Sequence, residues 1–238
     1  MISNTRSRMP ATARSLAARL KHNTSGVALI EFAFAAPLVL GMGMMGTDTA
    51  YLVITHLQVS QIAMQVADNA SRVGEQDVLI ARKVNERDVV ESLTGAEKLG
   101  QSLDFYESGR IIISSLQRNP DGGQWIAWQR CRGAIRHDSS YGVEDDGKTG
   151  MGLPGMGEPG RYITASPGTA VMFVEVAYDY EPLTPITVFE DKRITYTAAF
   201  NVRDNRDLSG GPKSNGLYPG TAGSPVARCS VYSAARPT

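Results

Sequence analysis

The sequence has few of the residues that build active sites and metal centres. Its 238 residues include only three histidines and two cysteines, with no Cys-x-x-Cys and no cluster of the two types. No Gly-x-Ser-x-Gly, phosphate-binding loop or His-Glu-x-x-His motif is present. The formal net charge is zero, which argues against a nucleic-acid binder. We therefore predict a protein that is not an enzyme and needs neither a metal nor another cofactor.

The three histidines are the candidate general bases. His22 belongs to a basic leader, and His56 falls on a predicted helix, where a surface or packing role is expected. The stretch "RHDSS" at 136–140 places His137 beside an aspartate and a serine, but catalytic triads are assembled in space and rarely from sequence neighbours. The acidic stretch "VEDDGKTG" lacks the spacing and the final glutamate of a calcium loop. We therefore expect no triad at 136–140 and a solvated acidic turn at "VEDDGKTG".

Acidic residues are missing from the first 25 positions, which hold five of the 24 basic residues: Arg6, Arg8, Arg14, Arg19 and Lys21. The rest of the chain carries 19 basic and 24 acidic residues. An apolar run follows the leader from Val27 to Gly46, and as a helix it would span roughly 30 Å, the thickness of a bilayer core. The positive-inside rule then places the N-terminus in the cytoplasm and the later residues outside it.

A cleaved secretory signal is the alternative to an anchor. Its cleavage site needs small neutral residues after the apolar run, and "TDTAY" at 47–51 puts Asp48 in such a position. We therefore favour an anchor and expect four segments. These are a basic cytoplasmic leader (1–26), a transmembrane helix (27–48), an extracytoplasmic continuation of that helix (49–74) and an extracytoplasmic α+β domain (75–238).

Periodicity predicts the elements of an α+β fold, in which the long N-terminal transmembrane helix extends into a small antiparallel β-sheet domain. Helical spacing continues to about Arg72, with Pro37 expected to kink the helix modestly. The turn "NPDGG" joins two strands in a predicted hairpin. The other expected elements are one or two short helices within 85–103, hairpin strands at 110–118 and 124–131, an exposed loop at 138–160, and strands at 169–182 and 193–203.

Cys131 and Cys229 both fall on the predicted outer side of the membrane. In an oxidising compartment a single disulfide is the natural pairing, although two unpaired thiols remain the alternative. Such a bridge would close a loop of about 98 residues, for which the chain-entropy model gives about 4 to 5 kcal/mol.

The start of the apolar run resembles the processing site of type IV pilin-like proteins. Gly26 is followed by "VALIEF", so that Glu31 stands five residues after the glycine. The resemblance implies cleavage between Gly26 and Val27 by a prepilin peptidase on the cytoplasmic side. A charged side chain in the membrane costs about 2.5 to 3.5 kcal/mol, and in a filament Glu31 could meet the new amine of a neighbouring subunit. The alternative is an uncleaved anchor whose Glu31 stays hydrated at the interface.

A longer stretch of the sequence is similar to the TadE-like pilus-assembly proteins. The matching positions are Glu31, Phe32, Ala33, Pro37 and Asp48, and "VEVAYDYEPLTP" at 174–185 resembles a strand and turn of that family. This resemblance implies a minor pilin-like component of a Tad/Flp pilus or secretion apparatus, acting in assembly and surface adherence. Asp48 would mark the outer membrane interface, with pairing to another subunit as a weaker option.

The resemblance also implies partners and a location. The partners would be other pilin-like subunits, the Tad assembly platform, the prepilin peptidase and the membrane, with no nucleic acid. The location would be the bacterial inner membrane, with a single span, a cytoplasmic N-terminus and a periplasmic domain, and possible incorporation in the pilus. One departure is that the segment between the matching stretches is longer than in the smallest members and carries its own hairpin and cysteine.

Two other classes of function stay open. A permanently anchored binding module of the cell envelope, unrelated to pili, would show no cleavage after Gly26. An anchored envelope hydrolase has the weakest support, because no catalytic set is visible in the sequence.

Overall fold

The computed structural model describes residues 11–22, 25–77, 80–184, 192–220 and 224–237. Arg6 and Arg8 of the basic leader and Pro185 of the second matching stretch lie outside the described residues. The chain divides into two compact units. The first holds residues 1–49 and 184–187, and the second holds residues 50–183 and 188–238.

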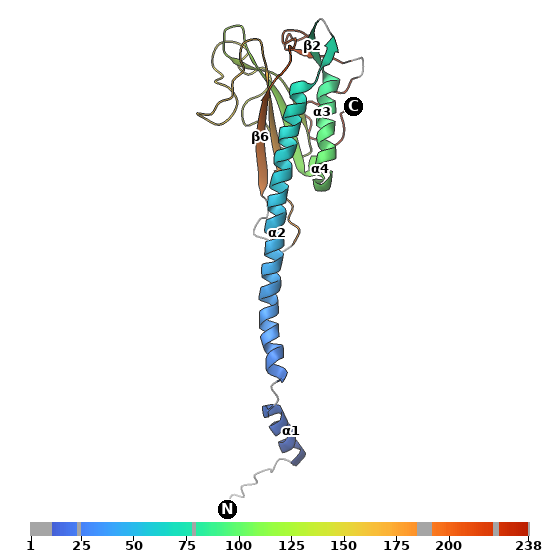
Figure 1. Cartoon of the computed structure of the whole chain (residues 1–238), viewed down its shortest axis with the longest axis vertical. Helices are drawn as coiled ribbons and strands as arrows, with labels where there is room; N and C mark the ends of the chain where they lie inside the picture. Colours follow the sequence, from blue (N-terminus) through green and yellow to red (C-terminus); the bar gives the residue numbers. More distant parts are fainter. Residues whose placement is uncertain (1–10, 23–24, 78–79, 185–191, 221–223, 238) are drawn as a thin grey trace, which may run out of the picture. The chain divides into compact units, whose positions relative to one another are not determined.

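Helix α2 (Ser25–Arg72) is a single helix of 48 residues that follows the shorter α1 (Ala11–His22). The predicted helix is confirmed, although it begins at Ser25, two residues before the expected start at residue 27, and it continues through Pro37. Among the described residues, this is the one helix long and apolar enough to cross a membrane. The chain therefore combines a long apolar helix near its N-terminus with the sheet described next (Figure 1).

The main sheet of the second unit has four antiparallel strands in the order β4-β3-β5-β6. The predicted hairpin is confirmed, and the Asn119 N–H closes its turn by donating to the Gly123 carbonyl at 2.9 Å. The two later strands also form and pair along their full lengths. The strands are β3 (Gly109–Arg118), β4 (Gln124–Arg132), β5 (Val171–Asp179) and β6 (Arg193–Asn201).

One face of this sheet packs against helices. The residues Met172, Val174, Val176 and Tyr178 of β5 share this face, as their alternation predicts, and they are buried with residues of α2 and of α3 (Glu86–Leu99). Trp125, Trp128 and Tyr180 belong to the same core. Asp88 in the first turn of α3 accepts the Asn85 N–H at 2.9 Å, which supports the predicted helix start.

The other face of the sheet packs against the segment between β4 and β5. Met156 and Ala165 of this segment are buried against Leu116, Ile126 and Phe173. The expectation that 138–160 is an exposed loop is therefore wrong in part, because Met156 is fully buried. The segment is a loop in conformation, yet part of it packs against this face of the sheet.

Several small elements were not predicted. The strands β1 (Glu75–Asp77), β2 (Ile80–Asn85) and β7 (Leu217–Tyr218) form a second sheet, in which β7 pairs in parallel with β2. A 3-10 turn, η1 (Gln101–Leu103), and a one-turn helix, α4 (Phe105–Ser108), follow α3. The C-terminal tail is thus part of the fold.

A disulfide joins Cys131 to Cys229, with an S–S length of 2.02 Å. Arg110 is fully buried beneath the same tail, and its guanidinium donates to the carbonyls of Gly133 and Val231 at 3.1 and 3.0 Å, and to that of Cys229. Its charge also lies 4.1 Å from the centre of the Tyr232 ring. The tail is therefore held to the sheet by a covalent bond and by a buried cation.

Candidate functional site

The first part of α2 exposes an apolar surface that begins at the expected processing site. Val27 is 53% exposed, and a Cβ atom at Gly26 would meet nothing within 4 Å. Glu31 is exposed, and among the described residues it has no ion-pair partner. The large apolar side chains that share this exposure are Leu29, Ile30, Phe32, Phe34, Leu38, Val39, Leu40 and Met42. Contiguous exposure on this scale is typical of a surface that lipid or another protein covers.

Asp48 is buried at the end of this apolar stretch, with 1% of its surface exposed. Its carboxylate accepts the Thr184 N–H at 3.1 Å and also the Thr184 hydroxyl. Thr184 belongs to the stretch "VEVAYDYEPLTP", so two segments singled out separately in the sequence meet here although they are 136 residues apart. Asp48 thus has a partner within its own chain, in addition to its expected place at the membrane interface.

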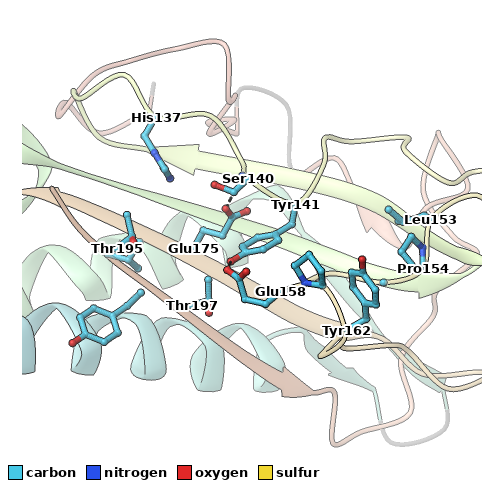
Figure 2. A pocket seen from close by; sticks show the side chains of 15 residues that line it. His137, Ser140, Tyr141, Leu153, Pro154, Glu158, Tyr162, Glu175, Thr195 and Thr197 are labelled. Carbon is cyan, nitrogen blue, oxygen red and sulfur yellow. Dashed lines mark hydrogen bonds between the residues drawn. The ribbon is translucent and has the colours of Figure 1, made fainter.

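A recess of about 680 Å³ opens beside β6 in the second unit. Its floor includes Glu175 of β5 and Thr195 and Thr197 of β6, and residues of the segment between β4 and β5 form its walls (Figure 2). Glu175 and Thr197 are direct cross-strand partners, so their side chains share one face of the sheet. Alternation places this face opposite the helix-packed one, which is why a carboxylate can stand between Val174 and Val176.

Two carboxylates line this recess. Glu175 is buried and accepts hydrogen bonds from the Ser139 hydroxyl and, at 2.9 Å, from the Ser140 N–H. Burial raises the pKa of Glu175, although both hydrogen bonds oppose that change. Glu158 is exposed at the rim, where it accepts the Tyr141 hydroxyl at 3.0 Å, and Figure 2 shows Tyr141 directed toward it.

The structure describes the side chains of two of the three histidines, His56 and His137. His56 lies on α2 with Nδ1 3.1 Å from the Tyr196 hydroxyl. His137 lines the recess, and burial followed by the charges of Arg193 and Arg110 lowers its pKa. A triad within "RHDSS" is not assembled, because Asp138 accepts the Tyr232 hydroxyl and Ser139 donates to Glu175. The side chain of His22 is not among the described ones.

Within the described part of the chain, no group of three or more His, Cys, Asp and Glu side chains could hold a metal ion. The recess was missed in the sequence. Its one available signal was Glu175, an acid in the middle of the apolar strand "VMFVEVAY". Its walls come from a glycine- and proline-rich segment without periodicity, so no local pattern predicts where they lie.

Comparison of this chain with protein-family models, with curated proteins and with solved structures finds no match.

Proposed function

We propose that this chain is a minor pilin-like component of a Tad-type pilus or secretion apparatus. In this proposal it is a non-enzymatic subunit, anchored in the bacterial inner membrane by the first part of α2. A prepilin peptidase cuts it between Gly26 and Val27, and the second unit lies in the periplasm. Its partners are then other pilin-like subunits and the assembly platform.

The observation that carries this proposal is the exposed apolar surface that follows Gly26 and bears Glu31. A carboxylate without an ion-pair partner is costly in a membrane, and a cut after Gly26 would create an ammonium group on Val27, four positions before Glu31. If subunits pack side by side, the amine of one and Glu31 of the next neutralise each other in one register only. Because only the paired register relieves the cost of placing Glu31 in the membrane, the glutamate favours the correct packing of subunits.

The bond between Asp48 and Thr184 supports the same proposal. It ties the end of the apolar surface to the second stretch that resembles the TadE-like family. A buried carboxylate that accepts a backbone N–H and a hydroxyl needs no counter-ion from another chain. This supports a structural role for Asp48 and makes its pairing with another subunit the weaker option.

The test is intact-mass measurement of the full chain after co-expression with an active prepilin peptidase. We expect the mature chain to begin at Val27, and Gly26→Val to block the cut. Gly41→Val is the matched control, because a Cβ at either glycine meets nothing within 4 Å, so neither change disturbs the fold. Retention of residues 1–26 in the presence of the active peptidase would overturn the proposal.

Glu31 is tested by comparing Glu31→Gln with Glu31→Asp. Both variants should insert in the membrane, because Glu31 supports no contact within the described fold. Glu31→Gln removes the charge and should impair processing or pilus assembly, whereas Glu31→Asp keeps the charge and should impair them less. Processing is measured by intact mass, and pilus assembly is observed by electron microscopy. If Glu31→Gln is processed normally and cells that carry it form normal pili, the assigned role of Glu31 is excluded.

The recess beside β6 favours a second candidate, a permanently anchored binding module of the cell envelope. Its volume of about 680 Å³ is within the range of about 300 to 1,000 Å³ typical of ligand sites. This candidate predicts an uncut chain, so the same mass measurement separates it from the first.

A further inference from the structure

The strand β6 forms one edge of the four-stranded sheet. Its only strand partner among the described residues is β5, and the pairing runs without a register shift from Arg193 to Asn201. Nine residues of regular strand at an edge present a row of backbone donors and acceptors. Such a row can pair with a further strand.

The hydrogen bonds just beyond the two ends of β6 show which residues direct their backbone outward. The Lys192 carbonyl accepts the Tyr180 N–H at 2.9 Å, and the Val202 N–H donates to the Ala170 carbonyl at 2.9 Å. Both bonds point toward β5 from even-numbered positions of this strand. Because backbone groups alternate in direction along an antiparallel strand, the odd-numbered residues direct theirs to the open edge. These residues are Arg193, Thr195, Thr197, Ala199 and Asn201.

The opposite edge of the same sheet is covered. On β4 the Ile126 N–H donates to the Asp146 carbonyl, the Ile126 carbonyl accepts the Asp145 N–H, and the Cys131 N–H donates to the Ala227 carbonyl, each at 2.9 Å. Between residues 194 and 200, β6 has no proline, no lysine and no bulge, which are the usual protections of an edge strand. Within the described residues, the fold therefore protects one edge and leaves the other open.

The recess lies beside this open edge. Thr195 and Thr197 are exposed, direct their backbone outward and line the recess with Glu175. A strand added to β6 would place alternate side chains about 4.5 to 5.5 Å from those of its neighbour on the same face. One of these side chains would therefore reach the recess.

Charge defines the side chain that fits there. Among the described residues, the lining contains the carboxyl groups of Glu158 and Glu175 and has no lysine or arginine, and His137 is the one lining residue there that can become a cation. We propose that the open edge of β6 binds an extended segment of a partner protein by strand addition, with a lysine or arginine side chain of that segment seated in the recess. The proposal concerns the second unit alone and holds whether or not the chain belongs to a pilus.

The probe is a seven-residue peptide of alternating threonine and valine with a central lysine, acetylated and amidated. We expect it to bind the full chain in detergent micelles, measured by isothermal titration calorimetry. A peptide with a central glutamate should bind about tenfold more weakly or worse, which corresponds to about 1.4 kcal/mol. Two further lysine peptides carry N-methylated amides, one peptide on one edge of the strand and the second peptide on the other edge. At least one of these two peptides should not bind, because strand addition needs the N–H groups of the edge that pairs with β6.

The matched variants are Thr197→Pro and Thr197→Ala. Both changes remove the Thr197 side chain from the recess, but only proline also removes an outward N–H, and proline is tolerated on an edge strand. Thr197→Pro should therefore abolish binding, while Thr197→Ala keeps the N–H and should still bind the lysine peptide, more weakly than the original protein does. Glu158→Gln should reduce the preference for lysine over glutamate. If Thr197→Pro does not fold, the N-methylated peptides on the unchanged protein still decide the question.

Four outcomes would overturn the proposal. They are no binding of the lysine peptide at about 1 mM, equal binding of the lysine and glutamate peptides, undiminished binding of both N-methylated forms, and binding that survives Thr197→Pro. Binding of a neutral oligosaccharide such as maltohexaose in place of the peptide would identify a carbohydrate site. Self-association that Thr197→Pro abolishes, without peptide binding, would identify a second copy of this chain as the occupant.

Discussion

Loss of the disulfide between Cys131 and Cys229 should cost more stability than any contact of the tail. The two cysteines are 98 residues apart, and the chain-entropy model gives about 4.7 kcal/mol for a closed loop of about 100 residues. The double variant Cys131→Ala/Cys229→Ala opens this loop in the unfolded chain. Its free energy of unfolding should therefore fall by about 4 to 5 kcal/mol.

Urea unfolding of the full chain in detergent micelles measures this loss. Trp125 and Trp128 are buried on the same strand as Cys131, so their fluorescence reports unfolding of the sheet. With a denaturant slope of about 2 kcal/mol per molar urea, the midpoint should fall by about 2 M. Reduction of the unchanged protein with a dithiol is the control and should give the same shift, because it opens the same loop.

A fall of less than about 1 kcal/mol would refute the loop-entropy reasoning. It would mean that the unfolded chain stays restricted without the bridge. Reduction and the double variant could also lower the free energy of unfolding by different amounts. Such a difference would assign part of the loss to packing of the Cys131 side chain, which is 3% exposed.

Two further changes test other contacts of the second unit. Arg110→Met should lower the free energy of unfolding by about 3 kcal/mol or more, because it leaves three carbonyl acceptors near the tail without their donor; urea unfolding with protease cleavage of the tail measures it. Burial alone would raise the pKa of Glu144, but hydrogen bonds from Lys213, from the Gln129 N–H and from Arg130 lower it overall. Its stabilising effect is therefore complete above the ordinary value of 4.5 and is lost as the pH falls through the lowered pKa. Glu144→Gln should flatten the decline of the thermal midpoint below about pH 5, and an unchanged decline would contradict this.

Elements with a strong periodicity could be predicted from the sequence. Helix α2 has helical spacing and no glycine from Thr47 to Val73, so its end at Arg72 agrees with the end predicted at about that residue. The hairpin was found because "NPDGG" separates two strand-like runs, and β5 because its apolar residues alternate. In each case the pattern lies within about 25 residues and reflects one buried face.

Elements that depend on distant partners could not be predicted. The strand β7 has two residues and exists only because Val84 and Asn85 of β2 pair with it. Met156 is buried because its loop packs against one face of the sheet. The loop sequence has no periodicity that would predict this burial. The recess has the same origin, since its floor and walls come from segments that only the fold brings together.

The tail explains how a long helix can end inside a folded unit. The last carbonyls of α2 have no partner within the helix, and leaving them buried and unpaired would be costly. Arg206 supplies donors from the tail, with Nη2 at 2.7 Å from the Val73 carbonyl and 3.3 Å from the Ala70 carbonyl. Burial, and then the charge of Arg82, lowers the pKa of Arg206 to about 10, which still leaves it charged at neutral pH and attractive to the negative end of the helix dipole. The glycine-rich tail, which the sequence presents as a loose end, therefore completes the helix that begins at the other end of the chain.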